Sequence, residues 1–346
     1  MEKLINKKLL RWYSNNYRKL PWRKSYRKNL PNPYFIFVSE YMLQQTTVPT
    51  VIKRFEEFIK KWPTLKKLSN ISESSILSFW SGLGYYSRAK NLLKAAKLIK
   101  KNYNYQIPTN LENLLSLPGV GDYTAKAILG IAFNKSVMPI DANIERIISR
   151  IYAFQSAPSE NKKKIIDKSV LFISKKSSTK LIQAFMDYGS IICIPRKPKC
   201  NECVIQIYCQ SHAKNLQNSI PIKKKTRTKK LKKFSRAYIF SNEKNEILIR
   251  KRPSKGMLAS MLEVPNDAWV NNKKDLVYDK LVLNIKGKLE QKGLIEYSFS
   301  HFDLETEVFF LKVKKIHFNN YKWIKKNNVN KIGLPTIMKK IIGLAY

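Results

Sequence analysis

Cysteine is missing from almost the whole sequence, and this absence limits the cross-links that the fold can contain. Its four cysteines lie within seventeen residues, and the other 329 of the 346 residues include none. Disulfide bonds across the fold are therefore excluded, whereas a small secreted scaffold would spread its cysteines along the chain. Long apolar runs are also missing, both at the N-terminus and later, so we expect neither a signal peptide nor a membrane span.

Acidic residues are scarce as well. The chain has 24 Asp and Glu against 66 Lys and Arg, which gives a formal net charge of +42. A field of this sign and size favours a polyanion as partner, most simply a nucleic acid. The alternative is a solvated basic surface, because Lys, Asn and Ile are abundant throughout, as in a chain from an A·T-biased genome. We expect a cytoplasmic protein associated with the nucleoid.

The clustered cysteines form a candidate metal site. Four thiolates on one short segment are a ligand set for iron or zinc, and buried hydrophobic cysteines have no reason to cluster in this way. Zinc usually takes two C-x2-C pairs or a Cys/His mixture, whereas the spacing here is C-x6-C-x2-C-x5-C. Iron–sulfur clusters also take four thiolates, with spacings that differ between families. The spacing alone leaves both metals open, with a slight preference for a cluster. The candidate ligands are Cys193, Cys200, Cys203 and Cys209.

The chain changes character near residue 220. Before it, apolar residues recur at three- and four-residue steps in 52–62, 92–99, 125–132 and 144–151, which predicts helices. Residues 219–236 then contain nine basic residues and no acidic one, as a linker would. Later runs are β-branched and aromatic, which predicts strands, and 335–346 can form a closing helix. The runs are 234–240, 246–251, 295–300 and 306–313. We therefore expect a helical domain over 1–216, a basic linker over 217–233 and a smaller α+β domain over 234–346.

Two short motifs in the helical part suggest chemistry. Leu117-Pro118-Gly119-Val120-Gly121 lies between helical segments, and its glycines permit a tight turn that bares N–H groups for a phosphate. This resembles a helix-hairpin-helix, which binds DNA backbone without regard to sequence; a plain turn between helices is the alternative. Asp141 precedes an apolar-periodic helix, so it is an N-cap by default and a catalytic carboxylate as the sharper alternative.

The order of these features resembles the endonuclease III superfamily of DNA glycosylases. A helix-hairpin-helix is followed about twenty residues later by an Asp, and then by the four cysteines, which the resemblance identifies as [4Fe–4S] cluster ligands in a loop over 193–209. Three further segments are similar to MutY-type adenine DNA glycosylases, and the similarity extends from about residue 8 to 340. They are LPWR at 20–23, VSEYMLQQT at 38–46 and GLGYYSR at 82–88.

The resemblance implies an enzyme that acts on double-stranded DNA and removes adenine mispaired with 8-oxoguanine or guanine. Adenine inside a duplex is out of reach, so it must be flipped into a pocket before its N-glycosidic bond is hydrolysed. Relatives that also cut the backbone carry a Lys where this chain has Tyr123, so we expect a monofunctional enzyme, acting as a monomer. The alternatives are a bifunctional glycosylase/lyase and a non-catalytic DNA-binding relic.

The resemblance also implies a role for each matching residue. Bond cleavage needs a proton on the leaving base and negative charge near the cationic sugar, and two carboxylates in different environments meet both needs. Glu40 would protonate adenine N7, and its apolar neighbours would raise its pKa. Asp141 would be the ionised partner that stabilises the cation or bonds to it transiently, with Tyr123 and Asn143 supporting the two carboxylates. Leu20, Trp22 and Arg23 match the adenine pocket, and Gln45 and Tyr85 match residues inserted near the lesion.

The C-terminal part resembles the Nudix-like module of the same family. Arg250 to Pro253 and Gly256 to Pro265 match its start, and Phe299-Ser300-His301 matches the loop that contacts 8-oxoguanine. Ser300 can donate and accept hydrogen bonds, so it can sense the protonated N7 of the oxidised base. The acidic R-E-x-x-E-E run that binds Mg²⁺ is missing, so we expect no hydrolysis of nucleoside triphosphates.

Two departures from the family pattern concern the candidate site. Ala142 follows Asp141 where the family usually has Gly; if that position has positive φ, Ala costs roughly 1 kcal/mol. About five residues are also inserted between Arg23 and Pro33, beside the predicted adenine pocket.

Overall fold

The computed structural model describes residues 1–346 except for 28, 175–177, 223–229, 254, 315–318 and 330–331. The chain divides into two compact units. The first contains Met1–Asn70 and Asn91–Thr226, and the second contains Ile71–Lys90 and Arg227–Tyr346. None of the helices in the described part of the chain is long and apolar enough to cross a membrane.

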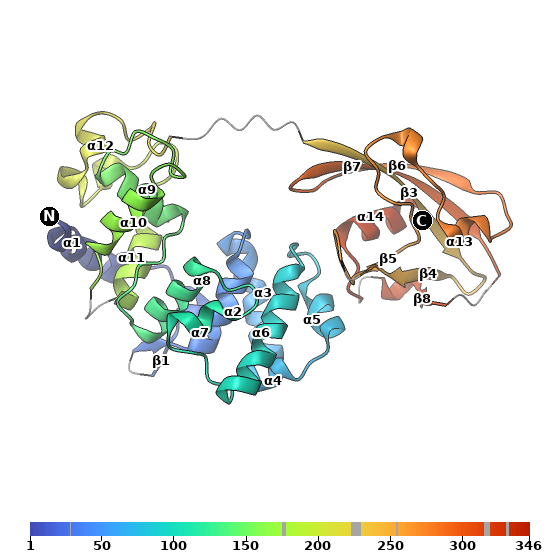
Figure 1. The fold of residues 1–346 in the computed structure, drawn as a ribbon, viewed down its shortest axis with the longest axis horizontal. Coiled ribbons are helices and arrows are strands. Elements are labelled where there is room, and N and C mark those ends of the chain that lie inside the picture. Colours follow the sequence, from blue (N-terminus) through green and yellow to red (C-terminus); the bar gives the residue numbers. More distant parts are fainter. Residues whose placement is uncertain (28, 175–177, 223–229, 254, 315–318, 330–331) are drawn as a thin grey trace. The chain divides into compact units, whose positions relative to one another are not determined.

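The first unit is helical, as the periodicity predicts (Figure 1). The four predicted helices correspond to α3, α6, α8 with its π-helical continuation η2, and α9. The main helices in chain order are α1 (Glu2–Asn16), α2 (Pro33–Leu43), α3 (Val48–Lys61), α4 (Leu65–Ser69), α6 (Ser87–Tyr103), α7 (Leu111–Leu115), α8 (Asp122–Ala127), η2 (Ile128–Ala132), α9 (Ala142–Ile151), α10 (Lys162–Val170), α11 (Ser178–Ile191) and α12 (Gln210–Ala213). Short 3-10 turns are η1 (Pro21–Arg23), η3 (Cys200–Glu202) and η4 (Gln206–Tyr208).

Helices α2 and α11 form the interior of this unit. Seven consecutive residues of α2, from Ile36 to Met42, are buried, and so are most residues of α11. A helix that is buried on all sides belongs to the core rather than to the surface. The N-terminal α1 packs on α11, and Tyr13 donates a hydrogen bond of 3.1 Å to Gln183 across this contact. Residues that are far apart in sequence therefore meet around these two helices.

The insertion after Arg23 forms a small antiparallel hairpin. Its strands are β1 (Ser25–Arg27) and β2 (Leu30–Pro31), and Ser25 pairs with Pro31. The extra residues thus extend a loop between η1 and α2 without interrupting either helix. Asn32 then caps α2, since its side chain accepts a 2.9 Å hydrogen bond from the N–H of Tyr34, and Pro33 occupies the first turn.

The second unit contains a mixed sheet. Its strand order is β5-β4-β3-β7-β6, with β8 paired to β4; β3 and β7 are parallel and the other pairs are antiparallel. The elements are α5 (Glu73–Trp80), β3 (Leu231–Ser241), β4 (Glu246–Lys251), β5 (Leu262–Glu263), η5 (Lys273–Asp275), α13 (Lys280–Leu283), β6 (Glu290–Ser298), β7 (Phe302–Lys312), β8 (Tyr321–Lys325), η6 (Lys326–Asn328) and α14 (Thr336–Leu344). The α+β prediction is confirmed.

Two details of this unit differ from the sequence expectations. Strand β3 begins at Leu231, so the last residues of the predicted linker belong to the sheet, while 223–229 lie outside the described residues. Strand β6 ends at Ser298, so Phe299 and Ser300 are in the turn to β7 rather than in a strand. Leu231 to Ser241 pair with β7, a contact distant in sequence that the charge count of the linker does not reveal.

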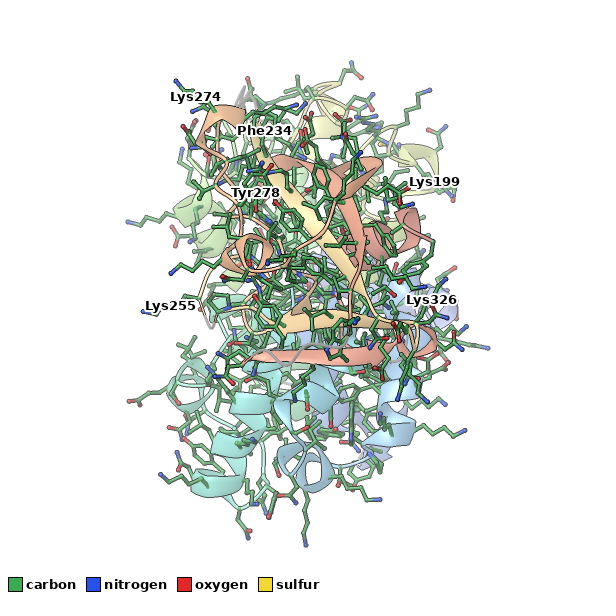
Figure 2. All side chains as sticks on the ribbon, turned by 90° about the vertical axis from the view of Figure 1, so that its right-hand side faces the viewer. Lys199, Phe234, Lys255, Lys274, Tyr278 and Lys326 are labelled. Carbon is green, nitrogen blue, oxygen red and sulfur yellow. The ribbon has the colours of Figure 1, made fainter. Side chains whose placement is uncertain are left out.

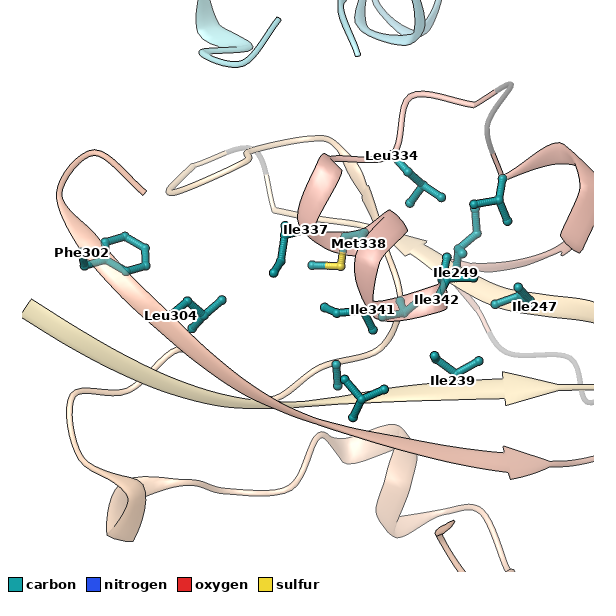
Figure 3. Packing of buried hydrophobic residues seen from close by; sticks show 14 residues of the cluster. Ile239, Ile247, Ile249, Phe302, Leu304, Leu334, Ile337, Met338, Ile341 and Ile342 are labelled. Carbon is teal, nitrogen blue, oxygen red and sulfur yellow. The ribbon is translucent and has the colours of Figure 1, made fainter. Parts of the chain in front are cut away.

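Helix α14 covers one face of the sheet. Ile337, Met338, Ile341 and Ile342 of α14 pack on Ile239 of β3 and on its neighbours (Figure 3). Tyr238 and Phe240 point to the opposite face, where Leu281 of α13 lies. This alternation is the period of two expected for a strand that is covered on both sides.

Much of the positive charge lies in solvent. The side chains of Lys199, Lys255, Lys274 and Lys326 are exposed and extend outward from the ribbon (Figure 2). Lysine side chains in this arrangement are available to an anionic partner, as the net charge predicts.

Candidate active site

Helix α2 carries Glu40 in the interior of the first unit. The side chain is 5% exposed, and its Oε2 accepts no hydrogen bond within the described residues. Burial raises the pKa of Glu40 to about 7, and the charge of Asp141 adds to this effect, whereas a hydrogen bond with Tyr123 and the charge of Arg23 oppose it. The carboxyl group is thus held near the protonation balance that a general acid needs at neutral pH.

Asp141 caps helix α9 and also reaches the same cavity. Its Oδ1 accepts hydrogen bonds from the N–H groups of Asn143, at 2.9 Å, and Ile144, at 2.7 Å. Its Oδ2 accepts from Nδ2 of Asn143 at 2.9 Å. Burial raises the pKa of Asp141, and these hydrogen bonds oppose that rise because they favour the charged form. The cap and the candidate catalytic carboxylate are therefore one group, and the two interpretations do not compete.

Both carboxylates line one cavity of about 540 Å³. The structure brings most of the predicted catalytic and base-binding residues of the helical part to its wall: Leu20, Trp22, Arg23, Glu40, Gln45, Tyr123, Asp141 and Asn143. It adds residues that the sequence interpretation missed, among them Arg18, Gln44, Met186 and Ser190. Met186 and Ser190 are four residues apart on α11, so they lie on one helix face. This spacing is the signal in the sequence that could have placed them together.

Ala142 does not carry the strain that the family comparison suggested. It is the first residue of α9, and it is not among the residues with positive φ. The condition for a steric cost at Ala142 is therefore not met. Gly189 does need to lack a side chain, because a Cβ atom there would lie 2.6 Å from Cβ of Asn143.

The Gly-rich turn between α7 and α8 is tight, as its glycines predict, but the N–H of Val120 donates within the turn to the carbonyl of Leu117, at 3.1 Å. Gly119 has φ of +80°, and a Cβ atom there would lie 2.8 Å from Cβ of Asn91. The hydroxyl of Tyr41 donates a 2.5 Å hydrogen bond to the carbonyl of Pro118, and Nε2 of Gln44 donates to the carbonyl of Gly119. Helix α2 therefore fixes this turn as well as Glu40. Val120 is buried, and Gly121 is the N-cap of α8.

Gln45 and Tyr85 share an unusual backbone conformation. Their φ angles are +55° and +47°, values that non-glycine residues adopt rarely and at a cost of roughly 1 to 3 kcal/mol. Both side chains are exposed, and that of Tyr85 is 44% exposed. Strained and exposed large residues are common at functional sites, since packing alone does not explain them.

In the second unit, Tyr85 lies beside the predicted lesion loop. Its hydroxyl is 2.6 Å from Oγ of Ser300, and both residues line a cavity of about 650 Å³ that also includes His301. Phe299 fixes the base of the loop, because its ring packs 4.9 Å from Phe302 and 5.4 Å from Trp269, between centroids. The loop thus presents polar groups from an aromatic support.

The four cysteines line one small cavity of the first unit, together with Arg150, His212 and Gln217. The guanidinium of Arg150 is completely buried and its Nη1 lies 3.3 Å from Sγ of Cys193. In the described part of the chain no three His, Cys, Asp or Glu side chains form a site for a single metal ion.

Arg146 connects the cysteine loop to the carboxylate cavity. Its Nε donates a 2.7 Å hydrogen bond to the carbonyl of Cys193, and its Nη2 donates to Oδ1 of Asn143 at 2.8 Å. Asn143 in turn holds Asp141. Because the charged guanidinium of Arg146 makes several short hydrogen bonds, it orders both the cysteine loop and Asn143.

Comparisons with known proteins agree with both units. Residues 38–170 match the family model described as HhH-GPD superfamily base excision DNA repair protein, and residues 236–344 match that of the NUDIX domain. The adenine DNA glycosylase of Buchnera aphidicola subsp. Baizongia pistaciae (strain Bp) is 34% identical, over 96% of this chain and 94% of that protein. The adenine DNA glycosylase of Buchnera aphidicola subsp. Schizaphis graminum (strain Sg) is 32% identical, over 97% of each.

A solved structure shows the fold of the helical part. It is the structure of a thermostable thymine-DNA glycosylase, with 28% identity and a TM-score of 0.55, covering 62% of this chain and 97% of that one. The resemblance that the sequence motifs carry is thus confirmed over almost the whole chain. With a helix-hairpin-helix glycosylase unit, a NUDIX domain and near full-length relatives, the chain belongs to the MutY-type family of adenine DNA glycosylases.

Proposed function

We propose that the chain removes adenine from A·8-oxoguanine and A·G mispairs in double-stranded DNA by hydrolysing the N-glycosidic bond. The observation that carries this proposal is the shared cavity of Glu40, with its pKa raised to about 7, and Asp141, whose carboxylate is held by backbone N–H groups. Two carboxyl groups with different environments in one cavity can act as acid and anion on one substrate.

The mechanism follows from the positions of these groups. The adenine flips out of the duplex into the cavity, where Glu40 donates its proton to N7 and makes the base a better leaving group. As the bond breaks, the positive charge that develops on the sugar is stabilised by Asp141. Water then attacks the sugar and gives its proton to the Glu40 carboxylate, which is ionised after protonating the base, and this leaves an abasic site. Tyr123 and Asn143 keep the two carboxyl groups in place by hydrogen bonding.

We also propose that the enzyme is monofunctional and acts as a monomer. A lyase step needs an amine that attacks the sugar, and no lysine is among the described residues that line the cavity. Lys126 lies one helical turn from Tyr123, but it pairs with Asp122 at 2.8 Å. Borohydride trapping of a covalent adduct would reveal a lyase and overturn this part.

Cys193, Cys200, Cys203 and Cys209 would hold a [4Fe–4S] cluster. The four cysteines line one small cavity, as the ligands of one shared metal group would. The choice of a cluster over zinc rests on the resemblance to the family. When bound, the cluster supplies iron–thiolate bonds that cross-link the loop. Iron content and visible absorption of the purified protein test this; stoichiometric zinc without iron would contradict it.

Ser300 is the proposed reader of the oxidised base. Its hydroxyl can accept a hydrogen bond from the protonated N7 of 8-oxoguanine, where guanine has only an acceptor. The contact with Tyr85 supports this role because it places at the same loop an aromatic side chain whose backbone has a strained, positive φ. We expect Ser300→Ala to reduce the preference for 8-oxoguanine over guanine.

The decisive experiment is single-turnover release of adenine from matched duplexes that contain A·8-oxoguanine, A·G or A·T. We expect release from the first two and none from the third. Tight duplex binding without base release would favour a DNA-binding relic instead.

A further inference from the structure

Asp187 is a buried carboxylate beside the base cavity that the mechanism does not use. It lies on α11 and is 0% exposed. Its Oδ2 accepts hydrogen bonds from the backbone N–H of Arg18, at 2.9 Å, and from Nη1 of Arg23, at 2.7 Å. Its Oδ1 accepts from Nε of Arg18 at 2.5 Å. One carboxylate thus holds two arginines that precede it by more than 160 residues.

These two arginines form a wall of the base cavity. Arg18, Leu20 and Arg23 line the cavity that contains Glu40 and Asp141. The same three residues line a second cavity, of about 870 Å³, with Tyr13 and Lys180. They therefore separate the two cavities. Asp187 lines neither of them, so it acts on a flipped base only through its arginine partners.

The positive charge of this wall affects the pKa of Glu40. The titratable and charged groups around the base cavity are Arg18 and Arg23 from the segment after α1, Tyr123 from α8, Asp141 from the cap of α9, and Glu40 itself. Arg23 lowers the pKa of Glu40, and the larger effect of burial opposes it. A carboxylate in contact with both arginines offsets their positive charge at this site.

We propose that Asp187 is a positioning residue for base excision, which holds Arg18 and Arg23 in the wall of the base cavity and balances their charge beside Glu40. This inference rests on the proposed adenine excision. A guanidinium group only donates hydrogen bonds, so its orientation decides which acceptor atoms of a base it can bind. Two of the three hydrogen bonds at Asp187 fix the orientation of such groups.

If Asp187 were only structural, its loss would not specifically change the pKa of Glu40. The chain contains a matched control for this test. Asp267 in the second unit has a fully buried side chain and accepts from Nε of Arg236, at 2.6 Å, and from the backbone N–H of Asp279, at 2.8 Å. Asp187→Asn and Asp267→Asn therefore remove the same charge from similar surroundings. Only the first removes it from the arginines that line the base cavity.

The first measurement is the pH profile of single-turnover adenine release for wild type and both variants. Without Asp187, the uncompensated arginines lower the pKa of Glu40, so the acid loses its proton at lower pH. We expect the descending limb of the Asp187→Asn profile to move down by about one pH unit, with a rate about tenfold lower above that limb. Asp267→Asn keeps the wild-type limb. Equal profiles for wild type and Asp187→Asn, or the same uniform loss in both variants, would overturn the proposal.

The second measurement is independent of catalysis. Carboxyl carbon NMR of the full chain with labelled glutamate, with the Glu40 signal assigned by its loss in Glu40→Gln, gives the titration midpoint of Glu40 directly. We expect a lower midpoint in Asp187→Asn and an unchanged one in Asp267→Asn; an unchanged midpoint in both would refute charge balancing. If wild type releases no adenine, the proposed function fails, but this midpoint still decides the role of Asp187.

Discussion

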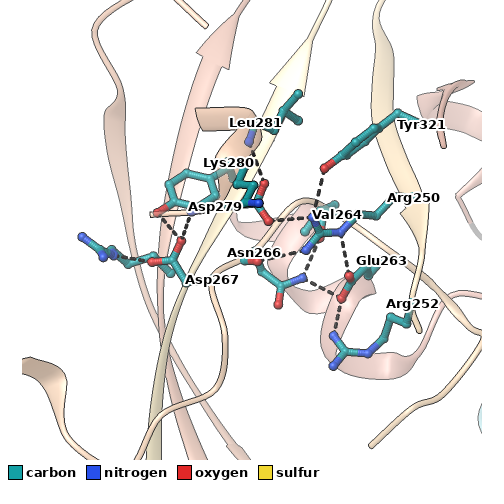
Figure 4. A network of polar contacts seen from close by, with 12 residues as sticks. Arg250, Arg252, Glu263, Val264, Asn266, Asp267, Asp279, Lys280, Leu281 and Tyr321 are labelled. Atoms are coloured by element: carbon teal, nitrogen blue, oxygen red, sulfur yellow. Dashed lines mark hydrogen bonds and ion pairs between the residues drawn. The ribbon is translucent and has the colours of Figure 1, made fainter. Parts of the chain in front are cut away.

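Two buried carboxylates, one in each unit, show how surroundings separate a structural group from a reactive one. In the second unit, Glu263 is 1% exposed and both of its oxygens are paired: Arg250 donates to Oε1 at 2.8 Å, while Arg252 and Asn266 donate to Oε2 (Figure 4). In the first unit, Glu40 is similarly buried, but its Oε2 has no partner among the described residues. No ion pair is formed by Glu40 in the described structure either.

The difference teaches that burial alone does not identify a catalytic acid. A buried carboxylate with arginines and an amide on both oxygens is stabilised in its charged form and orders the fold around it. A buried carboxylate with an unsatisfied oxygen retains its proton near neutral pH and can bind or protonate a ligand. Each prediction below changes one side of this comparison.

The largest effect is expected for Glu40→Gln. The amide has the shape of the acid but cannot donate the N7 proton, so the rate of adenine release should fall by about 10²- to 10⁴-fold. Single-turnover kinetics on an A·8-oxoguanine duplex measure this, and duplex affinity serves as the control because it should change little. An undiminished rate would remove Glu40 from the mechanism.

A second effect concerns stability and pH. The folded-state pKa of Glu40, about 7, lies above its ordinary value of 4.5, so the native state binds the extra proton between these values. The stabilisation is fully present below pH 4.5 and is lost as pH rises through 7, by roughly 3 kcal/mol. Urea unfolding should show that the unfolding free energy of the first unit falls between pH 4.5 and 8 in wild type. In Glu40→Gln the slope of this fall should be weaker. Identical slopes would mean that Glu40 titrates normally.

The opposite pattern is expected for Glu263→Gln. Removing this charge takes away the ion-pair partner that the described residues give Arg252, whereas Arg250 keeps its ion pair with Asp279, at 2.6 Å. We expect the second unit to lose about 3 kcal/mol of unfolding free energy, while the rate of base release at saturating protein falls far less than in Glu40→Gln. A rate loss as large as that of Glu40→Gln would show that the two carboxylates do not differ in the way proposed.

The smallest effect is expected at Ala142. Because Ala142 begins helix α9 without positive φ, Gly at this position relieves no strain and only loosens the helix start. Ala142→Gly should cost roughly 0.5 to 1 kcal/mol of stability and leave adenine release within about twofold of wild type. A clear gain in rate would mean that the loop at Asp141 is strained after all.

The sequence predicts the individual helices and strands better than the contacts between them. The helix around 144–151 and the strand at 246–251 follow from local periodicity, because each depends on neighbouring residues. The pairing of Asp187 with Arg18 and Arg23 joins α11 to a segment more than 160 residues earlier, and a buried aspartate on α11 has no local signal. The parallel pairing of β3 with β7 is hidden for the same reason.

The candidate site was accessible mainly through resemblance. Periodicity alone makes Asp141 an N-cap, and the structure confirms that cap; only the family motifs connect it with Glu40, about one hundred residues earlier. Arg18, Met186 and Ser190 escaped both approaches. They lie outside the recognisable motifs, and their position at the cavity depends on how α1 and α11 pack.

Asp141 is both the N-cap of α9 and a proposed catalytic carboxylate, and this combination has an evolutionary consequence. Since the carboxylate that is proposed to stabilise the sugar also begins helix α9, most replacements would damage the protein twice, by removing the charge and by losing about 1 kcal/mol of capping. Asparagine, serine and threonine are exceptions, because their side-chain oxygens can still accept from the helix start. A lineage that abandoned repair could therefore pass through an inert but well-folded Asp141→Asn form, whereas replacements that cannot cap the helix would also reduce stability.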